Sequence, residues 1–217
     1  MGLTEMRRDT VPANYFNPRA YVKANPATGL LYTRQGKRLI AIPEILVQSI
    51  HQTLLSEAGD AASMAFYTFG YSWGKSFYER IKKEIEIYYE TSIAQMNAAE
   101  FFAVVQEVWG VHGLGKINVD FTAAKQGLLI VTIENSGISA SQNDQKESKE
   151  FSVEAGFLSG WFSANTRQEL NAIATDWEQN RTQYLVGAKL HIEQIKLNFV
   201  SKGMKTAAIL AKNQFTL

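Results

Sequence analysis

Two helix-like stretches of the chain each carry a pair of glycines four residues apart among aromatic side chains. The pairs are Gly70 with Gly74 and Gly156 with Gly160. Glycine in a helix interior costs about 1 kcal/mol relative to alanine, so such pairs in apolar helices need a compensating gain. Two gains are open. Small residues at this spacing allow two helix backbones to approach closely, or they leave room for a flat ligand between aromatic rings.

Composition narrows the class of protein. The chain has 217 residues, of which 46% are hydrophobic and 20% charged, as in a single globular domain. The formal net charge of +1 gives no electrostatic reason to expect a nucleic-acid partner. No apolar run reaches the roughly 18 residues that a membrane-spanning helix needs, so we expect no membrane span. We expect a cytoplasmic location because the sequence contains no cysteine. The sequence has no cysteine, which excludes disulfides, thiolate metal ligands and thioether attachment of a haem or bilin.

The order of the residue patterns predicts an α+β domain, in which an antiparallel sheet is covered by a layer of helices. Residues 1–28 are expected to form an extended arm with little regular structure, and residues 29–217 a single domain with a flexible polar loop at 135–149. Residues 188–217 fit both a strand and a helix. The expected elements are a hairpin at 30–42, helices at 43–58, 61–90, 97–109 and 150–165, and strands at 116–121, 128–133, 170–177 and 183–187.

The helix expected at 61–90 is apolar on two sides, which predicts a position between two layers of the fold. Beyond Arg80 it becomes charged, so we expect that end to reach solvent. The aromatic residues of this helix and of the helix at 150–165 have two interpretations. They form an ordinary core, or they line a slot between the two glycine-bearing helices that takes a flat ring system.

Three short segments carry a resemblance to a known family. From about residue 61 to residue 187 the layout resembles the 4-vinyl reductase domain, a small-molecule-binding module related in fold to subunits of the TRAPP vesicle-tethering complex. Many members have a cysteine on each side of the turn in their last hairpin. The matching positions here are Trp177 and Gln183, which excludes a thiolate role. The segments are Phe69-Gly70-Tyr71-Ser72-Trp73-Gly74, Glu154-Ala155-Gly156-Phe157-Leu158-Ser159-Gly160-Trp161 and Ala174-Thr175-Asp176-Trp177-Glu178-Gln179-Asn180-Arg181-Thr182-Gln183-Tyr184-Leu185-Val186.

The resemblance implies a protein that binds a hydrophobic ligand. The family includes handlers of tetrapyrrole intermediates, and this cysteine-free chain with its arm resembles cyanobacterial relatives linked to photosystem assembly. The function implied is a non-catalytic binding and assembly protein. It would hold a bilin, haem or chlorophyll precursor without a covalent bond, form a homodimer, and work on a photosynthetic membrane-protein complex at the periphery of the thylakoid membrane. One alternative is a protein–protein interaction module without a ligand. The other is a vinyl reductase, for which the sequence offers no reductant site.

The candidate ligand-binding residues are mostly aromatic. Arg80, Lys75 or Lys82 could pair with the carboxylates of a tetrapyrrole. No Ser-His-Asp pattern or zinc spacing suggests a catalytic residue or a metal site. The predicted binding set is Phe69, Trp73, Phe77, Arg80, His112, Phe157, Trp161 and Trp177.

Two polar residues have a structural and a functional interpretation. His112 follows a helix in a glycine-rich turn, so it is expected to cap the carboxyl end of that helix; as the alternative it is an axial ligand of a metallo-tetrapyrrole. Glu154 at the start of a helix is expected to complement the helix dipole. If Glu154 is buried, it could accept hydrogen bonds from pyrrole N–H groups.

Overall fold

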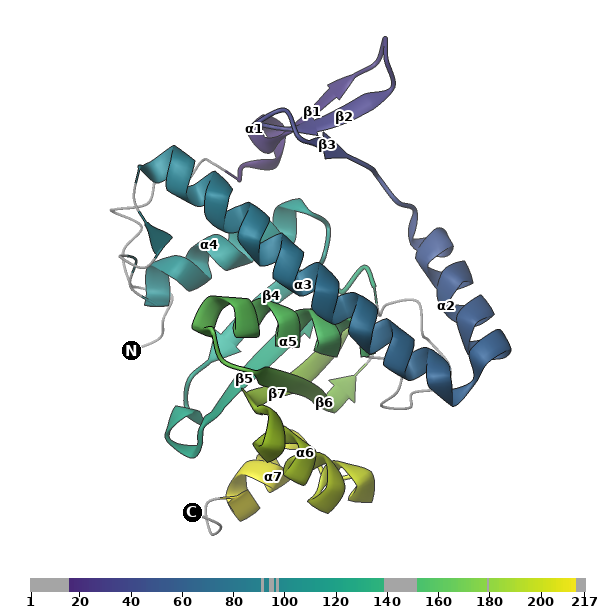
Figure 1. Cartoon of the computed structure of the whole chain (residues 1–217), viewed down its shortest axis with the longest axis vertical. Coiled ribbons are helices and arrows are strands. Elements are labelled where there is room, and N and C mark those ends of the chain that lie inside the picture. The colour runs from purple at the N-terminus through teal and green to yellow at the C-terminus, as the bar shows by residue number, and fades with distance from the viewer. Residues whose placement is uncertain are drawn as a thin grey trace.

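The main sheet has four antiparallel strands in the order β4-β5-β7-β6. The computed structural model describes residues 16–90, 92–93, 96, 98–138, 152–178 and 180–213. The expected α+β class, with helices covering an antiparallel sheet, is confirmed (Figure 1). The strands are β4 (Lys116–Asp120), β5 (Leu128–Glu134), β6 (Leu170–Glu178) and β7 (Arg181–Ala188).

Both faces of this sheet are covered by helices. Alternate residues of β5 point to opposite faces, as a strand requires: Val131 and Ile133 join the larger core cluster, while Leu128 and Ile130 join a second cluster. The larger cluster lies under α3 (Asp60–Tyr89), α4 (Ala98–Val111) and α5 (Ser152–Thr166). The second lies against α6 (Lys189–Asn198) and α7 (Thr206–Asn213). The segment 189–213, for which the sequence allowed either a strand or a helix, is mainly helical.

The glycine pairs are the contact between α3 and α5. A Cβ atom added at any of the four glycines would fall nearer than 3.0 Å to a backbone carbonyl of the opposite helix. Close backbone approach is thus the gain that compensates for the low helix propensity of glycine. The expected slot for a flat ring between these two helices is wrong, because their backbones touch there. The carbonyl partners belong to Val153 for Gly70, Phe157 for Gly74, Tyr67 for Gly156 and Tyr71 for Gly160.

A separate small sheet precedes these layers. It consists of β1 (Val22–Asn25), β2 (Leu30–Thr33) and β3 (Arg38–Leu39), preceded by the single-turn helix α1 (Pro18–Tyr21). The prediction of an irregular arm is therefore wrong for residues 18–25, because β1 pairs antiparallel with β2. Residues 1–15 of the predicted arm lie outside the described residues.

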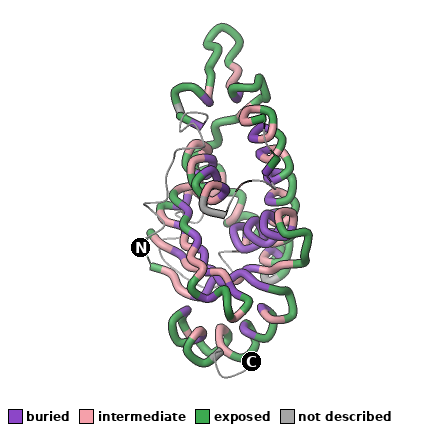
Figure 2. Tube along the Cα trace, turned by 90° about the vertical axis from the view of Figure 1, so that its left-hand side faces the viewer, coloured by how far each residue is buried: buried purple, intermediate pink, exposed green. Residues whose placement is uncertain are grey.

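Helix α2 (Glu44–Ala58) connects the small sheet to α3 and contains no buried residue. It ends at Gly59, whose φ of 53° suits glycine, and α3 begins at the next residue. Figure 1 shows α2 beside α3, with the small sheet beyond the opposite end of α3. Figure 2 shows that burial is concentrated in the middle of the molecule and that the small sheet is mostly exposed. Of the loop expected at 135–149, residues 139–149 lie outside the described part of the chain.

Candidate functional site

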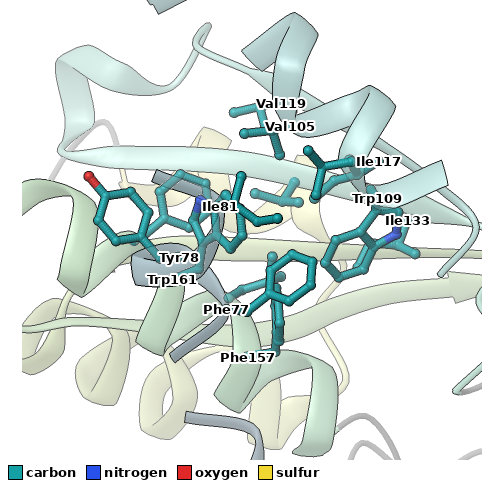
Figure 3. Packing of buried hydrophobic residues seen from close by; sticks show 14 of the residues in the cluster. Phe77, Tyr78, Ile81, Val105, Trp109, Ile117, Val119, Ile133, Phe157 and Trp161 are labelled. Carbon is teal, nitrogen blue, oxygen red and sulfur yellow. The ribbon is translucent and has the colours of Figure 1, made fainter. Parts of the chain in front are cut away.

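Aromatic side chains from three helices meet above the main sheet (Figure 3). The ring of Phe77 on α3 lies 5.5 Å from the rings of both Phe157 and Trp161 on α5. Trp73 approaches Phe157 to 4.5 Å and Trp109 of α4 approaches it to 5.0 Å, both edge to face. Tilted and edge-to-face contacts are the favoured arrangements of aromatic pairs. These five residues are called the aromatic cluster below.

The indole N–H of Trp161 is the unusual group in the aromatic cluster. Trp161 is 3% exposed, and its Nε1 has no hydrogen-bond partner among the described residues. By contrast, Nε1 of Trp109 donates to the carbonyl oxygen of Leu114 at 2.7 Å. Buried Trp N–H groups ordinarily find an acceptor. Within the described part of the chain, the cluster therefore contains an indole donor that is surrounded by rings and has no acceptor.

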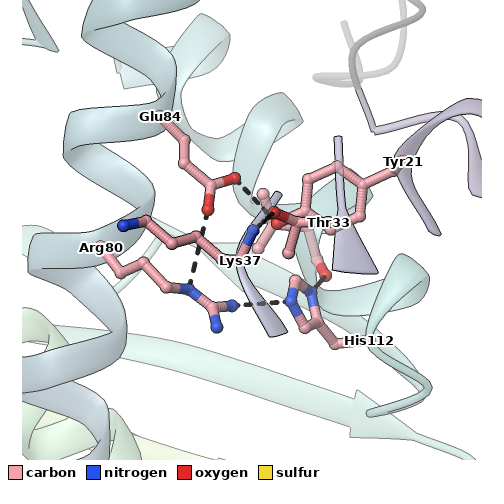
Figure 4. Close-up of polar contacts among 7 residues, drawn as sticks. Tyr21, Thr33, Lys37, Arg80, Glu84 and His112 are labelled. Carbon is pink, nitrogen blue, oxygen red and sulfur yellow. Dashed lines mark hydrogen bonds and ion pairs between the residues drawn. The ribbon is translucent and has the colours of Figure 1, made fainter. Parts of the chain in front are cut away.

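Figure 4 shows a polar network that includes Tyr21, Arg80, Glu84 and His112. This network borders the aromatic cluster at Phe77. The guanidinium of Arg80 lies over the Phe77 ring, 4.9 Å from its centroid, and Nη2 of Arg80 is 2.7 Å from Nε2 of His112. Nδ1 of His112 is 2.8 Å from the carbonyl oxygen of Val108. Because a carbonyl only accepts, Nδ1 carries the hydrogen, and the free lone pair of Nε2 accepts from Arg80. Both ring nitrogens are therefore occupied.

The charge state of His112 agrees with this arrangement. Burial, assisted by the charge of Arg80, lowers the pKa of His112 to about 4, although the hydrogen bond to Val108 acts in the opposite direction. The imidazole is thus neutral near pH 7. The expected role at the carboxyl end of a helix is confirmed, since Val108 lies in the last turn of α4. The axial-ligand alternative would require Nε2 to leave Arg80.

The same network ties α1, which leads into the small sheet, to α3. The Tyr21 hydroxyl donates to Oε2 of Glu84 at 2.8 Å, and Nε of Arg80 is 3.9 Å from Oε1 of Glu84. Glu84 is only 2% exposed, so the expectation that α3 reaches solvent beyond Arg80 is wrong at this position. A buried carboxylate needs such partners to remain charged. The Tyr21 ring is also 5.5 Å from the His112 ring.

Glu154 is a second buried carboxylate, on the sheet side of α5. It lies in the first turn of α5, as expected, and accepts hydrogen bonds from the hydroxyls of Ser136 and Tyr184. Burial and the charge of Glu154 raise the pKa of Tyr184 well above its usual value, so Tyr184 keeps its proton and donates it. Each carboxylate oxygen of Glu154 thus already accepts a hydrogen bond from a side chain of the protein.

Six of the eight predicted binding residues come together: Trp73, Phe77, Arg80, His112, Phe157 and Trp161. The other two lie outside this group. Phe69 is 60% exposed and stacks on Trp73 at 6.3 Å. Trp177 lies on β6 opposite Thr182 and is partly buried against the larger core cluster. Lys75 is exposed and Lys82 half-buried.

Three residues of the site escaped sequence reasoning. Trp109 lies at the end of the helix expected at 97–109 and Tyr21 in the arm expected at 1–28, and neither belongs to the predicted binding set. Glu84 was expected to face solvent. Their contacts join segments far apart in the chain, and periodicity within one helix carries no signal for such pairing.

No group of His, Asp or Glu side chains suited to a metal ion occurs among the described residues. Within the same ranges, no helix has both the length and the apolar character needed to cross a membrane.

Comparison with known proteins places the fold. No protein-family model matches the chain, and no curated protein matches it. Among solved structures, it is similar to the phenol-responsive sensory domain of the transcription activator PoxR with phenol. The TM-score is 0.62 at 12% sequence identity, over 88% of this chain and 95% of that one. At this identity the likeness extends to the fold alone.

Two further structures represent the families that the sequence resembles. One is a trafficking protein particle complex subunit 3 from Naegleria fowleri covalently bound to palmitic acid, with a TM-score of 0.47 and 12% identity over 68% of this chain and 95% of that one. The other is a vinyl-4-reductase family protein from Methanocaldococcus jannaschii, with a TM-score of 0.44 and 11% identity over 70% and 83%.

Proposed function

We propose that this protein is a non-catalytic binding module for a flat, largely apolar molecule that carries a hydrogen-bond acceptor. The observation that supports this most is the unpartnered Nε1 of Trp161 inside the aromatic cluster. A ligand oxygen or ring nitrogen placed there would satisfy a donor that has no partner among the described residues, and the surrounding rings would stack on the ligand. The solved structure with the same fold and a TM-score of 0.62 contains phenol, a small aromatic molecule with one oxygen.

The route to the cluster would run along α3. Phe69 is exposed, Trp73 half-buried and Phe77 buried, so successive turns of the helix lead from solvent into the aromatic cluster. Because α3 and α5 touch at their glycines, the ligand would lie beside this helix pair rather than between its members. Binding sites are typically apolar with few polar anchors, and this surface fits that description.

The finer proposal is a tetrapyrrole, such as a bilin, haem or chlorophyll precursor. Arg80, Lys75 or Lys82, all of which belong to α3, would pair with its carboxylates. Assembly of a photosynthetic complex, and a location at the thylakoid periphery, follow from the family resemblance. A vinyl reductase is the competing enzymatic function. A reductase would consume a bound vinyl tetrapyrrole when a nicotinamide reductant is added. A carrier would leave the absorbance spectrum of the bound tetrapyrrole unchanged by that addition.

The test is a ligand titration. Biliverdin, haemin, chlorophyllide and phenol are added to the protein, and absorbance and tryptophan fluorescence are recorded. Trp161→Phe keeps a ring but removes the donor, so we expect about a tenfold weaker affinity, equivalent to one hydrogen bond of about 1.4 kcal/mol. Trp177→Phe, outside the cluster, is the matched control and should bind as the wild type does. The proposal fails if none of the four binds, or if Trp161→Phe binds as tightly as the wild type.

Exposed apolar residues on α2 favour a second function, self-association or docking on a larger complex. Ile45 on this helix is 65% exposed, and α2 buries none of its residues. Large exposed apolar surfaces mark interaction sites. We propose a homodimer, which is compatible with ligand binding because the two surfaces involve different residues.

A further inference from the structure

The outward face of α2 carries an aliphatic stripe. Leu46, Ile50 and Leu54 are spaced four residues apart, which places them on one face of a helix. All three are between 39% and 50% exposed. They are called the α2 stripe below.

The α2 stripe is distinct from the face that holds α2 on the protein. That inner face uses His51, whose ring stacks on Phe66 of α3 at 4.5 Å, and Leu55, which packs on the small cluster around Phe66. Successive residues of a helix are about 100° apart, so the neighbours Ile50 and His51 point in different directions. Contact with α3 therefore leaves the stripe uncovered.

A helix of this length needs more support than one narrow contact. Helices of about 12–15 residues are marginal in water unless an apolar face is packed, and α2 has 15 residues, none of them buried. The proposed flat ligand is a poor occupant, because the stripe is the convex ridge of a helix and ligand sites are concave. An anionic lipid surface is disfavoured as well, since Glu44 and Glu57 are the only charged residues of α2.

We infer that the α2 stripe packs against the same stripe of a second copy of this chain, with the two helices antiparallel around a two-fold axis at Ile50. Two-fold symmetry makes one patch meet itself, which suits an uncharged aliphatic surface. In this register Leu54 faces the partner's Leu46. Glu57 lies on the same helix face, 20° from Ile50 by the roughly 100° step, and would reach the amino end of the partner's α2, where the helix dipole favours a carboxylate.

This inference rests on the self-association proposed above and identifies the α2 stripe as the surface involved. The inference does not depend on the proposed ligand. The first test is the molar mass in solution by light scattering across protein concentrations. The wild type is expected as a dimer. Ile50→Glu brings two carboxylates together on the axis, so the dissociation constant should rise at least a hundredfold. Leu197→Glu, at a 71% exposed site on α6, should leave the dimer intact. Circular dichroism verifies that both variants are folded.

A second test uses the absence of cysteine from the chain. Ile50→Cys should form an intermolecular disulfide under mild oxidation, because each Ile50 meets its counterpart on the axis, while Leu197→Cys should not. An equimolar mixture of Leu46→Cys and Leu54→Cys should give mainly the mixed disulfide, as the antiparallel register requires.

The outcomes separate this inference from the proposals before it. A dimer that survives Ile50→Glu and does not cross-link at Ile50→Cys overturns the surface but not self-association. A monomer at every concentration overturns both, and the ligand titration stands apart. If instead the wild type binds vesicles containing anionic lipid and Ile50→Glu abolishes that binding, the stripe faces a membrane and the inference is wrong.

Discussion

His112 has both ring nitrogens engaged by the protein, and this decides what the residue can do. Nδ1 donates to Val108 and Nε2 accepts from Arg80, so the ring is held as one neutral tautomer. Protonation would force an N–H against the guanidinium of Arg80. A histidine that looks like a ligand in the sequence is therefore a positioning group for Arg80, and Arg80 in turn covers the ring of Phe77.

The neutral His112 makes stability depend on pH. Its pKa of about 4 in the folded protein lies below the usual 6.5 of the unfolded chain. Between these values the unfolded state binds more protons, so this contribution is fully present above pH 6.5 and is lost as the pH falls towards 4. The loss amounts to about 3 kcal/mol. We predict that His112→Gln, which stays neutral, flattens the pH dependence of urea unfolding in this window.

The comparison between His112→Gln and the wild type cancels the titration of carboxylates, since both proteins contain the same ones. If the two free energies of unfolding fall in parallel between pH 6.5 and 4, His112 is not the group responsible.

At the scale of elements, the contact between α3 and α5 organises the helical layer. Glycines on both helices allow the backbones of α3 and α5 to touch, and this contact is called the seam below. Side-chain hydroxyl groups form hydrogen bonds along the seam. Tyr67 donates to Oγ of Ser159 at 2.8 Å, and Ser159 in turn accepts from the backbone N–H of Ala172 on β6 at 2.8 Å. The seam thus connects α3 through α5 to the sheet, which keeps the aromatic cluster in place.

Replacing one glycine of the seam tests its role. The Cβ of Gly74→Ala would collide with the backbone of Phe157, so we predict a loss of about 1–3 kcal/mol through overpacking. Gly110→Ala is the matched control: it is also helical, and its Cβ meets nothing within 4 Å. This control should be stabilised by up to about 1 kcal/mol from helix propensity. Urea unfolding measures both, and equal effects at the two sites would contradict the close contact.

Helices and strands with clear periodicity were predictable. The long helix expected at 61–90 is α3, and the strand pairs at 116–133 and 170–187 are found in place. The glycine spacing predicted close helix packing correctly. It could not distinguish this packing from a ligand slot, because the same spacing is compatible with both. Residues 18–25 and 189–213 could not be assigned because their pairing partners are distant or their pattern fits two periods.

The sequence predicted which types of residue form the candidate site. It did not predict which of these residues contact one another across different helices. Trp73 and Phe77 lie on a helix with a clear aromatic stripe, so their inward direction could be foreseen. Their meeting with Trp109 depends on how α4 packs on α3 and α5. That Trp161 finds no acceptor among the residues that the structure describes depends on this packing, and no spacing within the sequence encodes it.

At the scale of the whole molecule, the residues that precede the small sheet pack into the core of the helical layer. Phe16 and Tyr21 are fully buried and belong to the larger core cluster. Aromatic residues of the arm therefore pack on their own domain. Deleting residues 1–28 should therefore weaken folding, because the deletion removes two core side chains.

Tyr21 offers a graded test of this attachment. Tyr21→Phe removes the hydroxyl that donates to buried Glu84 and should cost about 1–3 kcal/mol. Tyr21→Ala also removes a ring packed against Phe16 and His112 and should cost about 3–5 kcal/mol. Tyr32→Phe, half-buried on the same small sheet, should be nearly neutral. Urea unfolding followed by tryptophan fluorescence gives the free energies.

Hydrogen exchange distinguishes local release from global loss of stability. If the small sheet unfolds as a separate unit, Tyr21→Ala speeds exchange in β1 and β2 alone and leaves β5 and β7 protected. If the attachment is part of the cooperative core, exchange rises in all four strands together. We predict the second result, because Glu84 and Arg80 of α3 belong to the same network as Tyr21. Accelerated exchange confined to the small sheet would show that the aromatic cluster is stable without it.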